Sequence, residues 1–296
     1  MHAGSIVIFS SCLLATAAPA LLAEEQGPSR VVSMNLCTDQ LAMLVAKPGQ
    51  LFSVSDLAAD PLGSVLAEQA RGIPVNHGFA EEVLVMKPDL VLATVFTPRA
   101  TVALLRRMGL RVEQFAPESS LEDIRTNVRK MGHALGRSQR AEEIVAVFDR
   151  ELALVRGSTS PGAPLAALYY SQNLTSGAKT LGDDVVSSAG LRNLSRELGL
   201  RGMARLTLET VMMAEPDVLV TGHKPSNAPA LAYENFQHPA MRRLLLKSQQ
   251  APVPDKYWIC GGPFTIEAVR LLAESEKSSL SRKVNHADHK STSVRP

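Results

Sequence analysis

Residues 81–93 read EEVLVMKPDLVLA, and residues 209–222 read ETVMMAEPDVLVTG. In both stretches an acidic residue starts an apolar helical segment, a Pro-Asp pair ends it, and a second apolar run follows. Alignment on Pro88 and Pro216 puts Glu81 opposite Glu209. Proline ends the helix, and a short apolar run bounded by turn residues is typical of a buried strand. This unit occurs once in each half of the chain, which predicts an internal duplication.

The sequence on either side of both units continues as alternating strands and helices. In the first half we expect strands at residues 30–35, 51–56, 73–76, 89–94 and 111–116. In the second half we expect them at residues 165–172, 217–222 and 251–260. Alternation of this kind predicts an α/β fold with parallel sheets. The fold class is therefore two parallel-sheet α/β lobes related by duplication.

A long amphipathic segment separates the two halves. Residues 138–157 place Ala141, Ile144, Val145 and Phe148 on one helical face, and a Gly/Pro/Ser-rich break follows. We expect a single helix that bridges the lobes. The expected units are a signal peptide (1–23), a first lobe (24–137), a bridging helix and linker (138–160), a second lobe (161–275) and a disordered tail (276–296).

Composition restricts the class of protein. The 296 residues are 45% hydrophobic and 20% charged, with a net charge of +2, so the charge balance does not favour a nucleic-acid partner. The first 23 residues contain no Asp, Glu, Lys or Arg and read as a secretory signal. We expect an exported, periplasmic monomer.

These motifs resemble those of a known family. The first strand and helix (RVVSMNLCTDQLAML), the two Pro-Asp units, the bridging helix and the segment VPDKYWICGGPFTIEAVRLLA are together similar to the periplasmic solute-binding proteins of ABC importers for ferric siderophores, haem or cobalamin. The resemblance implies a metal-chelate ligand in a cleft between the lobes and a membrane permease as partner. It also implies that Glu81 and Glu209 dock onto that permease, one from each lobe; the alternative is that they are only charges at helix N-termini.

Ligands of open α/β sheets bind beyond the carboxyl ends of the strands. Tyrosine and tryptophan at such positions suit a flat, amphipathic chelate. The candidate ligand-binding residues are Asn35, Leu36, Cys37, Ser55, His77, Phe79 and Phe96 in the first lobe, and Tyr169, Tyr170, His223 and Trp258 in the second.

Two cysteines, Cys37 and Cys260, remain after the signal. They could contact ligand, pair across the cleft or fill space as small packing residues, and packing is the preferred interpretation. The sequence does not show whether they come within the distance that a disulfide needs.

The sequence gives less support to an enzymatic or metal-ion-binding function. The chain has no Gly-rich phosphate loop, no G-x-S-x-G motif and no HExxH motif, so an exported enzyme is the less favoured alternative and no catalytic residue, resident cofactor or structural metal is expected. A protein of the same importer class could instead bind a metal ion through His77 and His223, or haem through Tyr169 or Tyr170.

Overall fold

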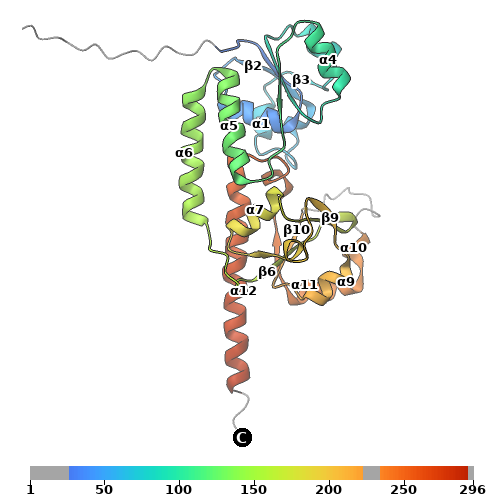
Figure 1. Cartoon of the computed structure of the whole chain (residues 1–296), viewed down its shortest axis with the longest axis vertical. Helices are drawn as coiled ribbons and strands as arrows, with labels where there is room; N and C mark the ends of the chain where they lie inside the picture. Colours follow the sequence, from blue (N-terminus) through green and yellow to red (C-terminus); the bar gives the residue numbers. More distant parts are fainter. Residues whose placement is uncertain (1–26, 223–233, 293–296) are drawn as a thin grey trace, which may run out of the picture.

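The computed structural model describes residues 27–222 and 234–292. The expected signal peptide (1–23) and His223 lie outside these residues. The described chain forms two α/β lobes, one above the other in Figure 1. Within these residues, no helix is both long and apolar enough to cross a membrane.

The first lobe is built on a five-stranded parallel sheet with strand order β3-β2-β1-β4-β5. Its strands are β1 (Val31–Ser33), β2 (Leu51–Ser55), β3 (Val75–Asn76), β4 (Leu90–Thr94) and β5 (Val112–Phe115). Its helices are α1 (Leu36–Val45), α2 (Ala67–Ala70), α3 (Ala80–Val85), α4 (Arg99–Arg107) and α5 (Leu121–Leu135). β4 is buried along its whole length, as the apolar run predicted.

The second lobe contains a four-stranded parallel sheet with strand order β11-β10-β6-β8. These strands are β6 (Leu165–Leu168), β8 (Arg192–Asn193), β10 (Val218–Thr221) and β11 (Gln249–Pro252). A separate antiparallel pair joins β7 (Leu174–Ser176) to β9 (Met203–Arg205). The helices are α7 (Leu181–Ser188), α8 (Leu194–Glu197), α9 (Leu208–Ala214), α10 (Glu234–Gln237), α11 (Pro239–Lys247) and α12 (Ile266–Thr292).

The two sheets share one arrangement, as the duplication predicted. In each sheet the first strand, β1 or β6, has a neighbour on both sides. One neighbour is the second strand of that sheet in chain order, β2 or β8. The other is the strand that follows the Pro-Asp pair, β4 or β10. The last strand, β5 or β11, then lies outside the Pro-Asp strand. A parallel sheet of this order requires a crossover helix between its strands, which explains why each Pro-Asp strand follows a helix.

The Pro-Asp pair has the same structural role in both lobes. The residue before each proline, Lys87 or Glu215, has a positive φ of 49° or 45°, which turns the chain from helix to strand. The aspartate then accepts backbone hydrogen bonds from the start of the first strand. Asp89 accepts from Ser29 N at 2.6 Å, and Asp217 accepts from Leu165 N at 2.9 Å. Each Pro-Asp pair therefore fixes its own strand against the first strand of its sheet.

Helix α6 (Ser138–Val155) connects the two halves of the chain. Its buried face packs on α5 and on α12, and α5 and α6 lie side by side in Figure 1. One continuous hydrophobic cluster runs from Leu90 in the first sheet, through Phe148 in α6, to Val220 in the second sheet. The lobes are thus joined by a shared core as well as by the chain.

The expected disordered tail is wrong for residues 276–292, which continue α12. No glycine or proline occurs between Ile266 and Thr292, so nothing in the sequence ends the helix there. Serine hydroxyls along the extension donate to backbone carbonyls one turn earlier, as from Ser278 to Glu274 and from Ser281 to Lys277, both at 3.0 Å. The polar composition suggested disorder, but this segment has no helix breaker.

Candidate functional site

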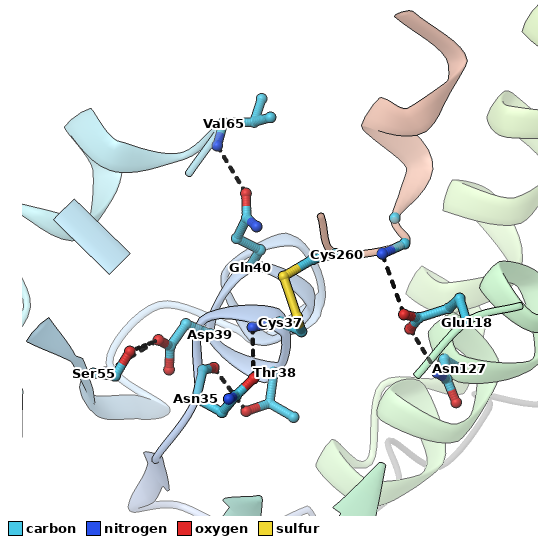
Figure 2. The surroundings of a disulfide bond; sticks show 12 residues. Asn35, Cys37, Thr38, Asp39, Gln40, Ser55, Val65, Glu118, Asn127 and Cys260 are labelled. Carbon is cyan, nitrogen blue, oxygen red and sulfur yellow. Dashed lines mark hydrogen bonds between the residues drawn. A yellow bond between two sulfur atoms is a disulfide. The ribbon is translucent and has the colours of Figure 1, made fainter. Parts of the chain in front are cut away.

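Segments that lie beyond the carboxyl ends of the two sheets meet at a disulfide. Cys37 lies just beyond β1, Cys260 lies beyond β11, and their sulfur atoms form a disulfide of 2.11 Å with the Cα atoms 5.1 Å apart. Figure 2 shows this bond between α1 and the segment before α12. The preferred interpretation of the cysteines as packing residues is therefore wrong. They pair across the lobes, and the Cys37 sulfur is used in the bond.

A cavity of about 390 Å³ opens at the carboxyl edge of the second sheet. Its volume is in the range of small-molecule sites. Apolar and aromatic side chains dominate the wall, with hydroxyl groups and one carboxylate among them. The lining residues are Tyr170, Ser171, Ser176, Gly182, Met203, Gly222, Phe236, Asp255, Trp258 and Ile259.

Two aromatic candidates from the sequence meet in this cavity. The rings of Tyr170 and Trp258 lie edge to face, with centroids 6.2 Å apart and an interplanar angle of 85°. The Tyr170 hydroxyl lies 3.4 Å from Ser176 Oγ. Burial raises the pKa of Tyr170 far above its ordinary value, so the phenol stays protonated and can act as a hydrogen-bond donor.

Tyr169 was expected in the cleft, but its side chain is completely buried. Its ring packs against Phe236, with centroids 5.7 Å apart, and its hydroxyl donates to Asn173 Oδ1. Successive side chains of an extended segment point to opposite sides. Of the two adjacent tyrosines, Tyr170 therefore lines the cavity and Tyr169 belongs to the core.

Several lining residues were not anticipated from the sequence. Met203 belongs to β9, whose antiparallel pairing with β7 has no clear sequence signal, and Ser176 Oγ donates to its sulfur at 3.6 Å. Phe236 comes from the short helix α10. Asp255 begins a 3-10 turn, Asp255–Tyr257, and Ile259 follows it, where a continuous strand over 251–260 was expected. The proline-rich start of that segment, APVP, was a signal against a strand through it.

The first lobe contributes aromatic side chains from the loops that follow its strands. Phe79 follows β3 and is 62% exposed, and Phe96 follows β4 and is 75% exposed. Phenylalanine with so much free surface at a strand end is unusual for a packing residue. Both side chains therefore present free apolar surface at the carboxyl edge of the first sheet.

Three other first-lobe candidates have structural partners. Asn35 caps α1, where its side chain accepts from Cys37 N at 3.0 Å. Leu36 is buried in the first turn of that helix. Ser55 is also buried, and its backbone N–H donates to Asp39 Oδ2 at 3.1 Å. The side chains of Asn35 and Leu36 and the backbone of Ser55 thus have structural roles in and beside α1.

Asp39 is a buried carboxyl group in the first turn of α1. Its Oδ2 accepts from the Ser55 backbone and hydroxyl groups, whereas its Oδ1 has no hydrogen-bond partner. Burial raises the pKa of Asp39 to about 7, although the nearby hydroxyl groups of Ser33 and Ser55 work in the opposite direction. The group therefore titrates near neutral pH, where ordinary carboxyl groups are fully ionised.

His77 forms an exposed pair with Glu82. The His77 backbone N–H donates to Glu82 Oε2 at 2.7 Å, and the ring Nδ1 lies 2.9 Å from Glu82 Oε1. This hydrogen bond raises the pKa of His77. Within the residues that the structure describes, no group of three or more His, Cys, Asp or Glu side chains could hold a metal ion.

Glu81 and Glu209 occupy matching places in the two lobes. Each is the second residue of its helix, α3 or α9, and each is exposed. Two hydrogen bonds lower the pKa of Glu209. The larger effect comes from its own backbone N–H, and the smaller one comes from the Thr207 side chain. Both positions present a carboxylate at a helix N-terminus on the surface.

Comparison with known proteins gives consistent results. A family model described as "Periplasmic binding protein" matches residues 31–239. A cobalamin-binding protein of Halobacterium salinarum is 25% identical over 200 residues, which cover 66% of this chain and 54% of that protein. The match thus spans about half the length of this curated relative.

Solved structures show the same fold at lower identity. The apo form of the periplasmic haem-binding protein RhuT from Roseiflexus sp. RS-1 has a TM-score of 0.67 at 23% identity, and the similarity covers 86% of this chain and 99% of that one. The periplasmic vitamin B12 binding protein BtuF of Vibrio cholerae has a TM-score of 0.59 at 17% identity, covering 86% of this chain and 98% of that one. At identities this low, the structural similarity establishes the shared fold alone.

Proposed function

This chain belongs to the periplasmic binding protein family, and we propose that it captures a metal chelate between its lobes and delivers it to the permease of an ABC importer. The observation that carries the proposal is the aromatic cavity at the carboxyl edge of the second sheet, next to the segment that the disulfide ties to the first lobe. The favoured ligand is a corrinoid or a ferric siderophore. The N-terminal signal expected from the sequence would export the protein to the periplasm.

The chemistry of the cavity supports a large, flat ligand with a polar rim. Tyr170, Phe236 and Trp258 offer rigid apolar surface, and Ser171, Ser176 and the Tyr170 phenol offer hydrogen bonds. Exposed Phe79 and Phe96 provide apolar surface on the opposite lobe. Aromatic contacts contribute most of the binding free energy of such sites, and a few polar groups fix the orientation.

Haem is the second candidate ligand. Two cavity residues, Met203 and Tyr170, carry groups that ligate haem iron in other proteins. The raised pKa of Tyr170 opposes tyrosinate formation before iron binds, and this favours a chelate held by ring contacts.

Absorbance titration tests the proposed function. Purified protein is titrated separately with cyanocobalamin, hemin and a ferric hydroxamate siderophore, because each of these chromophores absorbs visible light. We expect saturable binding of one of them at one site per chain. Failure of all three to bind would contradict a chelate-binding function, and a hemin spectrum with a shifted Soret band would favour haem.

Trp258→Ala should weaken binding of the preferred chelate by roughly 10- to 150-fold, because about 1.5–3 kcal/mol accompanies burial of a large apolar side chain. The dissociation constant from the same titration measures the loss. Trp258→Phe is the matched control and should retain most of the affinity, since it keeps an aromatic surface. An unchanged affinity for Trp258→Ala would remove this residue from the site.

Charge reversal at Glu81 and Glu209 should separate delivery from capture. The double variant Glu81→Lys/Glu209→Lys is expected to bind chelate as the wild type does and to lower ligand uptake through the permease at least about 10-fold, as loss of charge pairs at an interface does. Uptake of labelled chelate by cells that carry the importer measures this effect. Glu143→Lys, an exposed reversal on α6, is the control and should leave uptake unchanged. Normal uptake by the double variant would reject the docking role.

A further inference from the structure

The disulfide lies next to the cavity through the segment that contains Cys260. Trp258 and Ile259 both line the cavity, and Cys260 follows them directly in the chain. The bond to Cys37 ties this segment to α1 of the other lobe, across 223 residues of sequence. One covalent bond thus joins a wall of the cavity to the opposite lobe.

Close packing holds the residues that follow Cys260. Gly261 N donates to Glu118 Oε2 at 3.2 Å, and Asn127 Nδ2 donates to the other oxygen of that carboxylate at 2.6 Å (Figure 2). A Cβ atom at Gly261 would lie only 2.5 Å from the Glu118 Cβ, so no side chain fits between them. Burial raises the pKa of Glu118. Two adjacent residues of this segment are therefore bonded to the first lobe: Cys260 by the disulfide and Gly261 by a hydrogen bond.

On the cavity side, local interactions hold the segment less firmly. Trp258 N and Ile259 N both donate to the Asp255 carbonyl, at 3.0 and 2.8 Å, which closes a single turn. Trp258 is half-buried and Ile259 is 60% exposed. The Trp258 ring packs against Tyr170 and the edge of the main hydrophobic cluster, whereas the exposed Ile259 adds little packing to the turn. The disulfide at Cys260, two residues further along, is the covalent anchor of the turn that carries the Trp258 ring.

We propose that the Cys37–Cys260 disulfide is a positioning element for ligand capture: it holds the Trp258–Ile259 wall at the cavity, so that the oxidised chain binds chelate and the reduced chain binds it weakly. This inference rests on the proposed function for the identity of the ligand. A dithiol reverses the bond by transferring two electrons and two protons: it is oxidised to its own disulfide, and Cys37 and Cys260 become thiols. Cys37 is the more accessible sulfur to attack, because Cys260 is 2% exposed and Cys37 is half-buried.

The chain provides its own reporter for this test. It contains a single tryptophan, so the intrinsic tryptophan emission comes from Trp258 alone. In ligand-free Cys37→Ser/Cys260→Ser protein we expect a shifted Trp258 emission maximum and greater access of acrylamide to the indole. With cyanocobalamin, hemin and the ferric hydroxamate as probes, we expect the dissociation constant of the bound probe to rise at least 10-fold. Wild-type protein treated with dithiothreitol should show both changes, and reoxidation should reverse them.

Leu105→Ala is the matched control. Leu105 is completely buried in the first-lobe core, in a cluster separate from the one that contacts Trp258, so this change lowers stability without touching the disulfide. It should leave Trp258 emission and probe affinity as in the wild type. Equal emission and equal affinity in the oxidised protein and the folded double variant would overturn the inference.

Two other results have defined meanings. If the double variant does not fold, the dithiothreitol titration of the wild type decides the question, because it starts from the native protein. If none of the probes binds the wild type, the proposed function fails, and Trp258 emission in the ligand-free protein still shows whether the disulfide positions the wall: a shift supports it and no shift rejects it.

Discussion

Cys37→Ser/Cys260→Ser is expected to lower the free energy of unfolding by about 5 kcal/mol. The bond closes a loop of 223 residues, and the chain-entropy relation assigns about 5 kcal/mol to a loop of this length. The effect arises mainly in the unfolded state, which the bond restricts. Cys260 is also buried in the native protein, so its replacement by serine places a hydroxyl group in the core.

Guanidinium unfolding, monitored by circular dichroism, measures this loss. Dithiothreitol should lower the unfolding midpoint of the wild type to about that of the double variant. It should leave the midpoint of the double variant unchanged, because the variant has no bond to reduce. A reduced wild type as stable as the oxidised protein would show that the lobes are held by their shared core alone. That core includes Phe148 and Leu272, which contribute to the same cluster from α6 and α12.

Asp39→Asn should change the pH dependence of stability by up to about 4 kcal/mol. In the folded chain the pKa of Asp39 is about 7, compared with an ordinary value of 3.8. The folded state therefore retains a proton that the unfolded state loses between these two pH values. Wild-type stability should fall by about 1.4 kcal/mol per pH unit over that window from this group, and Asp39→Asn should lack this contribution.

Urea unfolding of both proteins from pH 4 to pH 8 checks this expectation. The quantity to compare is the difference between variant and wild type, since other titrating groups cancel in it. The difference should increase in favour of the variant up to about pH 7 and then level off. A constant difference would mean that Asp39 is ionised in the native protein throughout, which the unpaired Oδ1 argues against. Asp89→Asn is a useful control, because hydrogen bonds from Ser29 and Arg30 lower the pKa of Asp89 despite its partial burial, so its effect should lie below about pH 4.

The fold was predictable from the sequence because local signals agreed with one another. The two Pro-Asp units, the alternation of strands with helices and the apolar face of residues 138–157 all pointed to two α/β lobes, and the strand orders confirm this. The last helix was harder to predict. Polar residues after Ser275 were compatible with disorder or with an exposed helix, and only the absence of helix breakers distinguished the two.

The site was less predictable because it depends on side-chain direction and on distances between lobes. Tyr169 and Tyr170 are adjacent in sequence, and only the exact end of β6 determines which one faces the cavity. Met203 and Phe236 reach the cavity from elements with weak sequence patterns. The Cys37–Cys260 pairing depends on an approach between segments 223 residues apart, which no local pattern encodes.

The Pro-Asp pairs also have a consequence for the order in which the chain can fold. Each aspartate closes a contact within its own lobe, 60 residues from Ser29 for Asp89 and 52 residues from Leu165 for Asp217. Contacts over such separations form at lower entropic cost than one over 223 residues. A chain emerging from synthesis can therefore complete its first sheet before the second exists. Cys37 and Cys260 belong to different lobes, so we expect their disulfide to form last and to mark chains in which both lobes have folded.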